Sequence, residues 1–287
     1  MIKSFIYPEI KEEDRIFGGG LFTEPIIKPD GDWRAIKIPD EDQNVAGVES
    51  SACYIEAQQS TDASLKEFQY NILDENDSAR FNALLSGGTE SGGDPIKGAL
   101  SMKNDGVVPQ WMMDWGNYIK SWADFHSWKG VDKDKCLLEG KKDASLWDKK
   151  FKIIAEKDTP LKTKYINLRE GLKRSPCPLS VCAWYEKNGK YYKPNGMRDT
   201  HLVKAEYVDK DNSIWIKDTY FPYIKVLEPN TDFEFAMYRT INRKLEVIHR
   251  SFLEILKGMV ILLQTFYEYT KKNMGDFIGS IFNKRQD

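Results

Sequence analysis

Residues 49–57 read ESSACYIEA, and this stretch decides the fold that the chain is expected to adopt. Small polar residues lead into Cys53, and a run compatible with a helix follows it. Ser50 or Ser51 suits the N-cap of a helix over residues 51–59, because a serine hydroxyl accepts a hydrogen bond from a first-turn amide. Cys53 then lies at a helix N-terminus, where the helix dipole and unpaired amides favour the thiolate. The pattern predicts a nucleophilic cysteine.

Two segments far downstream carry the partners that such a cysteine needs. Residues 199–205 read DTHLVKA, so His201 opens an apolar alternation typical of a strand. Residues 214–220 read IWIKDTY, and Asp218 ends the next expected strand. Neighbouring antiparallel strands bring such side chains together on one face of a sheet. His201 is therefore the candidate base and acid, and Asp218 the candidate residue that orients its imidazole.

Attack of a thiolate on an amide creates an oxyanion, which needs hydrogen-bond donors. The expected donors are the backbone N–H of Cys53 and the side-chain amide of Gln43, which lies upstream of it. The residues together predict a thiol hydrolase in the chain order nucleophile, base, orienter. The remaining candidates carry no such motif: Cys136 lies in a segment rich in Lys and Asp, and His126 and His249 are expected to be structural.

Composition excludes several classes of protein. A chain of 287 residues with 41% hydrophobic and 30% charged residues is ordinary for a globular protein with a full core. A net charge of -2 gives no sign of a nucleic-acid surface. The 4 cysteines are scattered and there are only 3 histidines, so neither a disulfide framework nor a zinc site is expected. No metal and no cofactor is predicted.

The sequence shows no targeting or membrane segment. Its first residues, MIKSFIYP, lack the apolar run of a signal peptide. The longest apolar stretch, residues 259–263, is far too short to span a bilayer. We expect a cytoplasmic protein with reduced thiols, or a virion-associated one if the source is a phage.

The chain divides into three parts by composition. Residues 1–42 are punctuated by Gly and Pro and are expected to form an extended N-terminal leader. In residues 43–241 helices come first and strands second, which predicts an α+β domain of two lobes. Helices are expected over residues 62–85, after Asp94-Pro95 and over 160–173. Strands are expected over residues 179–184, 190–192, 201–208, 213–217 and 233–238, with a hairpin turn at Asn188-Gly189.

Residues 242–287 form the third part, a C-terminal helical extension. Apolar residues recur at spacings of three and four between residues 242 and 272, which is the heptad pattern of a helix that packs against partners. Two interpretations follow: the helix packs on its own domain, or it forms a homo-oligomer or docks to a larger assembly. The seam consists of Leu245, Ile248, Phe252, Ile255, Met259, Leu262, Phe266 and Tyr269.

Residues 111–147 are rich in tryptophan and are expected to form short helices and loops. Aromatic density of this kind ordinarily packs a core or a lid. A rim that binds peptide or glycan is the alternative.

At these residues the chain resembles the papain-like (C1) cysteine peptidases, and among them a divergent branch from phages and bacteria. The resemblance covers roughly residues 35–241. Gln43 resembles the oxyanion-hole glutamine, and Ser51-Ala52-Cys53-Tyr54 resembles the catalytic cysteine motif. Asp218-Thr219-Tyr220 takes the place of the Asn-Ser-Trp motif that orients and shields the histidine.

Further segments of the chain share this resemblance. Gly92-Gly93 is similar to the Gly-Gly loop that binds the substrate backbone, and Tyr220 replaces the shielding tryptophan. Residues 104–109, NDGVVP, and the strand from Pro178 to Ala183 are also similar. The resemblance implies a helical lobe with the cysteine, a β lobe with the histidine and the acid, and hydrolysis of a protein or peptide through a thioester.

The chain departs from the family pattern in four respects. An Asp replaces the orienting Asn, which adds negative charge beside His201. Gln43 lies farther from Cys53 than usual, with Glu49 between them. The usual disulfide cysteines are missing. The 52 residues before Cys53 are too few for a typical inhibitory pro-domain, so control by a large propeptide is not expected.

Three interpretations of function remain open. The first is a cysteine endopeptidase, which the Gln43, Gly92-Gly93 and Asp218-Thr219-Tyr220 pattern favours. The second is a peptidoglycan amidase or a transglutaminase-like enzyme, which uses the same Cys-His-Asp order. The third is a non-catalytic papain-like subunit, for example of a phage virion, that docks through its terminal helix. An occluded Cys53, or a sulfur beyond reach of the histidine, would favour the third.

Overall fold

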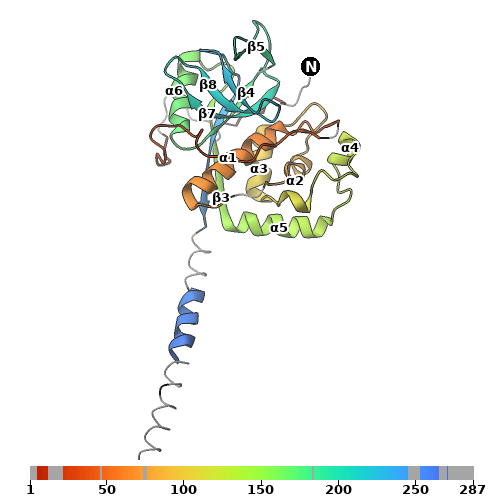
Figure 1. Cartoon of the computed structure of the whole chain (residues 1–287), viewed down its shortest axis with the longest axis vertical. Coiled ribbons are helices and arrows are strands. Elements are labelled where there is room, and N and C mark those ends of the chain that lie inside the picture. Colours follow the sequence, from red (N-terminus) through yellow and green to blue (C-terminus); the bar gives the residue numbers. More distant parts are fainter. Residues whose placement is uncertain are drawn as a thin grey trace, which may run out of the picture. The chain divides into compact units, whose positions relative to one another are not determined.

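The computed structural model describes residues 5–11, 22–45, 47–73, 76–182, 184–244, 253–264 and 270. Contacts within the chain divide it into two compact units, residues 1–242 and 243–287. In the first unit a group of helices and a sheet form two lobes (Figure 1). The predicted α+β, two-lobed fold is confirmed.

Helix α1, Cys53–Tyr70, is the central helix of the first unit. Residues 53–59 and 61–66 of α1 are buried, polar as well as apolar side chains, because the helix packs on strand β7 (His201–Val208) and on other helices. It ends at Asn71, whose φ of 53° is left-handed and whose backbone N–H donates to the Glu67 carbonyl. Helix α1 therefore joins the helix predicted over residues 51–59 to the first part of the helix predicted over 62–85.

The other helices of this lobe begin at polar caps. The side chain of Ser78 caps α2 (Ala79–Leu85), and Asp94 caps α3 (Pro95–Asn104) as its sequence predicted. The short helices η2, α4 and the longer α5 complete the lobe; they span Gln110–Met112, Trp122–Phe125 and Lys133–Leu146.

The buried Arg80 of α2 fixes the Trp-rich segment. Its guanidinium donates to five backbone carbonyls, those of Asp114, Asp124, Phe125, Ser127 and Lys129. The Trp115 ring lies 4.5 Å from Phe125, and the Trp122 ring stacks on His126 at 4.2 Å. These tryptophans pack the lobe.

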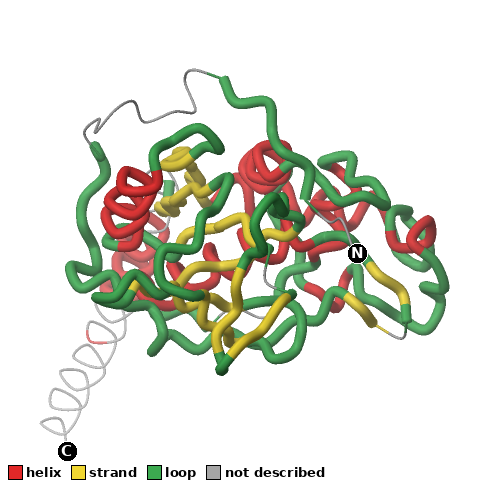
Figure 2. The backbone as a smooth tube through the Cα atoms, turned by 90° about the horizontal axis from the view of Figure 1, so that it is seen from above, coloured by secondary structure: helices red, strands yellow, loops and turns green. Residues whose placement is uncertain are grey.

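The sheet has eight strands in the order β3-β10-β4-β7-β8-β9-β6-β5. All described pairs are antiparallel except β6 with β9. Helix α6, Leu161–Leu172, packs against it. Figure 2 shows most of the strands gathered in one group with helices beside it. The strands are β3 Trp147–Ala155, β4 Cys177–Val181, β5 Tyr185–Lys187, β6 Lys190–Tyr192, β7 His201–Val208, β8 Ile214–Lys217, β9 Ile224–Leu227 and β10 Ala236–Arg243.

Several of the predicted β features occur as expected, among them β6 and β8, and others were wrong. Strand β7 has the predicted bounds, and Asn188 and Gly189 form the hairpin turn with φ of 54° and 77°. The predicted strand at residues 233–238 begins later, as β10. The short helices and loops expected over residues 111–147 end instead in the longer helix α5 and the first residue of β3. Helix α5 buries only Cys136, Gly140 and Ala144, which explains its weak apolar periodicity.

The two lobes meet at a buried ion pair between α1 and β10. Arg239 donates to both carboxylate oxygens of Asp62, at 2.6 and 2.8 Å, and to Gln58 Oε1 at 2.7 Å. Burial would raise the pKa of Asp62, but the Arg239 charge outweighs it and holds the pKa below its usual value. The pair therefore stays charged within the core.

In the second unit, residues 253–264 are helical and every one of them is exposed. Ile255 and Leu262 of the predicted seam are 62% and 70% exposed. Asn242 and Arg243 end strand β10, so the start predicted for this helix was wrong. Most of the remaining seam lies outside the described residues. Among the described residues no helix is long and apolar enough to cross a membrane.

Candidate active site

Cys53 is the first residue of α1 and follows a turn with a strained backbone. Ser51 has a φ of 54°, which is left-handed and unusual for a residue other than glycine. The turn is held because Glu49 Oε1 accepts from the Ser51 N–H at 3.0 Å and Ser51 Oγ donates to the Glu90 carbonyl at 2.9 Å. The N-cap is Ala52, without a side-chain cap, so the predicted serine cap was wrong. The serines shape the turn instead.

His201 and Asp218 lie together as the strand pattern predicted. His201 begins β7, Asp218 follows β8, and these strands are antiparallel neighbours. The His201 Nε2 and Asp218 Oδ1 atoms are 2.6 Å apart. Asp218 Oδ1 also accepts from the backbone N–H groups of Thr219 and Tyr220, and Oδ2 accepts from Lys225 Nζ at 2.5 Å. The carboxylate is fully occupied and its orientation is fixed.

The sulfur of Cys53 lies against the start of β7. It accepts a hydrogen bond from the Leu202 N–H at 3.3 Å. His201 Nδ1 is the ring nitrogen that does not face Asp218, and it has no hydrogen-bond partner of good geometry among the described residues. This nitrogen is left for the Cys53 sulfur. A negative charge on that sulfur raises the pKa of the imidazole.

The charges around His201 favour its protonated form. Burial alone would lower the pKa of His201, but the Asp218 carboxylate and the negative charge of Cys53 outweigh burial and raise it to about 10. Burial likewise opposes ionisation of Asp218, and His201 and Lys225 reverse this and hold the Asp218 pKa below its usual value. At neutral pH these charges favour an imidazolium at His201 beside the Asp218 carboxylate.

Gln43 belongs to a hydrogen-bonded cluster beside this pair. Its Nε2 donates to Glu49 Oε1 at 2.7 Å and to the Tyr220 hydroxyl, and its Oε1 accepts from Thr219 Oγ1 at 2.9 Å. The Tyr220 hydroxyl donates to Glu49 Oε2 at 2.7 Å. Burial and the Glu49 carboxylate together raise the pKa of Tyr220, so its hydroxyl keeps its proton. Both hydrogen-bonding ends of Gln43 are engaged.

Aromatic rings cover the imidazole. The Tyr220 and Trp184 ring centroids lie 5.3 and 5.1 Å from that of His201. Trp184 Nε1 donates to Thr200 Oγ1 at 3.0 Å. Sequence reasoning missed Trp184, Glu49 and Lys225 as parts of the site. Trp184 is the last residue of the strand predicted over residues 179–184. This position was the only sign in the sequence that Trp184 could belong to the site.

Gly92 and Gly93 lie close to the residue that follows Cys53. A Cβ on Gly93 would come within 2.0 Å of the Tyr54 ring, so only glycine fits there. Gly92 has a φ of 98°. The Gly93 carbonyl accepts a hydrogen bond from the Ile6 N–H at 3.1 Å, and Phe5 pairs with Gly93 as a parallel β-bridge. The chain's own N-terminal segment therefore occupies the backbone that was predicted to bind substrate.

Cys53 and His201 are fully buried, at 0% exposure each. Phe5 is 7% exposed and belongs to the same apolar cluster as Cys53, Tyr54 and Phe235. Its ring centroid lies 6.1 Å from that of Phe235. Cys53 and His201 are therefore closed to solvent in this structure, and Phe5 packs in the cluster that contains Cys53.

Phe5→Ala is expected to speed alkylation of Cys53 by iodoacetamide. A fully buried Phe side chain contributes about 1.5–3 kcal/mol, so its loss should raise the rate about tenfold or more. Leu73→Ala, at a side chain that is 80% exposed, is the control and should leave the rate unchanged. Intact mass measures the alkylation rate. Equal rates for wild type and Phe5→Ala would show that Phe5 does not close the site.

The other thiols are poor candidates for a second nucleophile. Burial raises the pKa of Cys136 and of Cys182, and also that of Cys177. His126 Nε2 lies 3.2 Å from the Ser50 carbonyl, and burial lowers the His126 pKa. Within the described part of the chain, no three His, Cys, Asp or Glu residues are grouped to hold a metal ion.

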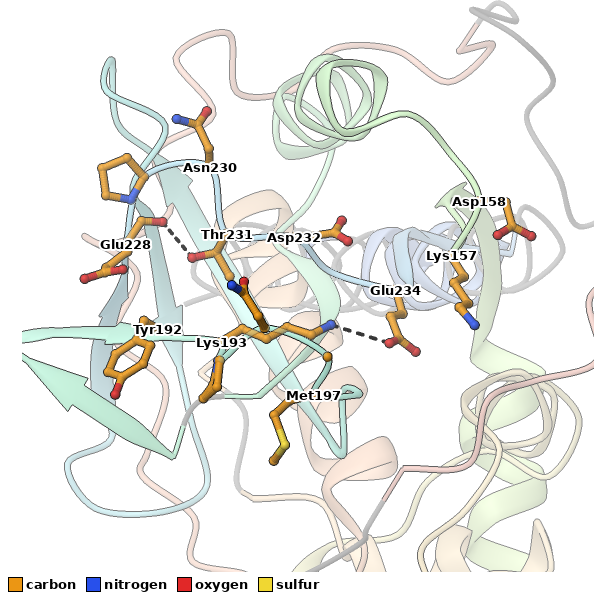
Figure 3. Close-up of a pocket in the computed structure, with 14 residues that line it drawn as sticks. Lys157, Asp158, Tyr192, Lys193, Met197, Glu228, Asn230, Thr231, Asp232 and Glu234 are labelled. Atoms are coloured by element: carbon orange, nitrogen blue, oxygen red, sulfur yellow. Dashed lines mark hydrogen bonds and ion pairs between the residues drawn. The ribbon is translucent and has the colours of Figure 1, made fainter.

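A separate cavity of about 470 Å³ lies in the β lobe (Figure 3). Lys193 reaches across it, with Nζ at 3.4 Å from Glu234 Oε1 and 2.8 Å from Asp199 Oδ1. Cys53, His201 and Asp218 do not line this cavity. It is therefore distinct from the candidate active site.

No protein-family model matches the sequence, and no curated protein sequence matches it significantly. Solved structures of low sequence identity do match. The bromelain protease from Ananas comosus, in complex with the E64 inhibitor, is similar with a TM-score of 0.51 and 17% identity, over 73% of this chain and 97% of that chain. Xylellain, a cysteine protease from Xylella fastidiosa, gives 0.55 and 13%, over 85% and 96%. A recombinant stem bromelain precursor gives 0.52 and 17%, over 79% and 78%. The chain has the papain-like fold of these cysteine proteases.

Proposed function

We propose that the chain is a cysteine peptidase that hydrolyses peptide bonds of a protein or peptide substrate. Residues 43–241 would form the peptidase domain, and residues 1–42 and 242–287 its extensions. The observation that carries the proposal is the arrangement at His201. One ring nitrogen lies 2.6 Å from Asp218, and the other is left for a cysteine at a helix N-terminus.

The reaction follows from these positions. The Cys53 thiolate attacks the carbonyl carbon, a C–S bond forms, and the carbonyl electrons move to oxygen. His201 gives its Nδ1 proton to the amine as the C–N bond breaks, which leaves a thioester. His201 then takes a proton from water, whose oxygen displaces the thiolate. Asp218 holds the ring in position throughout.

Gln43, Gly92, Gly93 and Tyr220 have supporting roles in this proposal. The Cys53 N–H and the Gln43 amide would bind the oxyanion, the glycines the substrate backbone, and Tyr220 would shield His201 from water. Because Gln43 donates to Glu49 and Tyr220 in this structure, it must exchange at least one of these bonds to reach an oxyanion. The N-terminal segment, which pairs with Gly93 in this structure, must also release that residue before it can bind substrate.

Cleavage of casein by the full chain tests the proposal. Wild-type protein should release peptides, and Cys53→Ala should not, while Cys182→Ala retains activity. Identical casein patterns for wild type and Cys53→Ala would refute the peptidase. Release of stem peptides from peptidoglycan sacculi, with casein left intact, would instead identify the amidase alternative.

Asp218→Asn is expected to move the alkaline limit of activity to lower pH. The active pair requires His201 protonated, and that proton is lost as pH rises through the His201 pKa of about 10. Without the Asp218 charge burial dominates, and the pKa falls by about 1–3 units. The pH profile of kcat/KM should therefore fall at a lower pH on its alkaline side. Asp211→Asn, which changes an exposed carboxylate, is the control. An unchanged alkaline limit would contradict the role given to Asp218.

One observation favours a second candidate, a non-catalytic papain-like subunit. Cys53 and His201 have no exposed surface, as a site that is never used would also show. In that case function would lie in the C-terminal helix, whose described residues expose Ile255, Met259 and Leu262. Oligomerisation or docking through residues 242–272 remains a proposal. Absence of both casein cleavage and thiol labelling in a folded chain would favour it.

A further inference from the structure

Lys225 is a buried lysine to which the proposed mechanism gives no role. Its side chain, on strand β9, is 3% exposed, and its Nζ atom lies 2.5 Å from Oδ2 of Asp218, whose side chain is 0% exposed. Burial of an ammonium group is costly unless the group is paired. A buried ion pair adds little net stability, because desolvation offsets the attraction of the two charges. Stability of the fold alone is therefore a weak reason for a lysine at this position.

Three neighbouring strands of the sheet supply an imidazole, a carboxylate and an ammonium group. His201 lies on β7, Asp218 follows β8, and Lys225 lies on β9, which pairs with β8. Asp218 Oδ1 faces His201 Nε2 at 2.6 Å, and Oδ2 faces Lys225 Nζ. The Asp218 N–H donates to the Tyr223 carbonyl at 2.7 Å, which holds the turn between β8 and β9. One carboxylate therefore bridges two basic side chains.

The Trp184 ring lies beside both basic side chains. Its centroid is 5.1 Å from that of the His201 ring and 5.9 Å from Lys225 Nζ. The Tyr191 ring centroid lies 5.2 Å from the same Nζ atom. Aromatic faces attract a cation, and salt screens buried charges much less than exposed ones. The charge of Lys225 therefore acts on Asp218 and His201 with little screening.

Without Lys225 the carboxylate would act on His201 with its full charge. An opposite charge within about 4–6 Å shifts a pKa by about 1–3 units, and a like charge acts in the opposite direction. The Asp218 carboxylate raises the pKa of His201, and an ammonium group beside the same carboxylate opposes this effect. In the proposed reaction His201 must release its Nδ1 proton to the leaving amine. Release becomes harder as the imidazole holds that proton more tightly.

We propose that Lys225 is a positioning residue that balances the charge of Asp218 beside His201. Its ammonium group occupies Asp218 Oδ2, which leaves Oδ1 for the imidazole. It also reduces the charge with which the carboxylate attracts the proton of His201. The catalytic part of this role rests on the proposed peptidase function, whereas the effect on the imidazole does not.

Four forms of the full chain test this balance: wild type, Asp218→Asn, Lys225→Met and the double variant. Asn and Met are close in size to the residues that they replace but carry no charge. NMR titration of the His201 ring nitrogens measures the His201 pKa in each form without any need for activity. The chain has only 3 histidines, so comparison with His201→Ala assigns the signal. Lys150→Met, at a lysine of β3 that is 56% exposed, is the control and should leave the pKa unchanged.

Lys225→Met should raise the pKa of His201 in both backgrounds. Asp218→Asn alone should lower that pKa, because Lys225 then lies near the imidazole without a carboxylate between them. The double variant should raise it again by at least about one unit relative to Asp218→Asn, although a second charge has been removed. Equal pKa values in Asp218→Asn and the double variant would overturn the proposal, since Lys225 would then only join β8 to β9. If one single variant fails to fold, the comparison in the other background decides.

Other titratable groups that face His201 are the same in all four forms. Among the described residues they are Cys53 and Glu56 of α1 and Tyr220, which follows β8. Burial raises the pKa of Glu56 well above its ordinary value and also raises that of Tyr220, so both stay uncharged near neutral pH. Cys53 is the group that can still change its charge. The titration repeated with Cys53→Ala should give the same order of the four pKa values, and a different order would overturn the balance.

Peptide hydrolysis at neutral pH tests the link to the reaction. Lys225→Met should lower kcat at least about fivefold in the wild-type background, because a more basic imidazole is a weaker acid toward the leaving amine. In the Asp218→Asn background the same change should instead raise kcat, because it restores the protonated imidazole. A loss of kcat in both backgrounds keeps the effect on the imidazole but rejects its use in catalysis. A chain with no peptidase activity fails the proposed function, and the NMR titration still decides the role of Lys225.

Discussion

Replacement of His201 with alanine is expected to slow peptide hydrolysis by at least about 10³-fold, with a folded protein and an intact Cys53. His201 supplies the proton for the leaving amine and balances the thiolate, and general acid–base catalysis alone contributes about 10²–10⁴-fold. Its burial and its 2.6 Å contact with Asp218 Oδ1 leave no other described group able to replace it at that position. The effect should lie mainly in kcat, because the imidazole acts on the reacting atoms.

His126→Ala is the matched control for this variant. His126 is also partly buried and contacts the backbone of the cysteine turn, at the Ser50 carbonyl, but no carboxylate in the described part of the chain pairs with it. Its loss should lower kcat by far less than the loss of His201. Equal losses for the two variants would mean that histidine packing, and not the Cys53–His201 pair, supports activity.

Asp62→Ala is expected to destabilise the fold by about 3–5 kcal/mol. The change leaves Arg239, which is 1% exposed, without its bidentate partner in the contact between α1 and β10. Because the folded pKa of Asp62 is lowered, the stability that it contributes is present above the unfolded pKa and is lost as pH falls through the folded value. Urea unfolding followed by circular dichroism measures the loss.

Glu139→Ala gives the comparison for an exposed pair. Glu139 and Lys142 lie 2.7 Å apart with side chains that are 38% and 60% exposed, so the loss should be within about 0.5 kcal/mol. If Asp62→Ala were as mild as Glu139→Ala, the pair between the lobes would not stabilise the fold.

The placement of His201 beside Asp218 could be predicted because the order, spacing and strand pattern of the three segments combine signals that are each weak alone. A small-residue turn precedes a helix, and two alternating strands follow each other with the histidine first and the acid last. Antiparallel pairing of β7 with β8 then brings His201 and Asp218 together without further information. The two-lobed fold followed from the same order of helices and strands.

Other parts of the site depend on tertiary packing and gave no such signal. The sequence IKVL of β9 suggests that Lys225 faces solvent, yet Lys225 is buried and Ile224 exposed. The register with β8 places Lys225 within 2.5 Å of Asp218 Oδ2, and this charge pair outweighs the apolar preference. Glu49 is a similar case, because its partner Tyr220 is 171 residues away in the sequence.

The N-terminal segment shows the same limit. Composition predicted an extended leader, but the pairing of Phe5 with Gly93 joins residues far apart in sequence. A short N-terminal segment therefore pairs with the Gly92-Gly93 loop, in a chain that was expected to have no large inhibitory pro-domain. Backbone pairing of this kind leaves no mark on a turn-rich sequence.

The most direct test of the Cys53–His201 pair is labelling with E64, the inhibitor bound in the bromelain structure, followed by intact mass. The full chain should gain one adduct, which Cys53→Ala abolishes and His201→Ala slows. Phe5→Ala, if it opens the site as expected, should label faster than wild type. A folded chain that gains no adduct in either the wild-type or the Phe5→Ala form would contradict an activated thiol at Cys53.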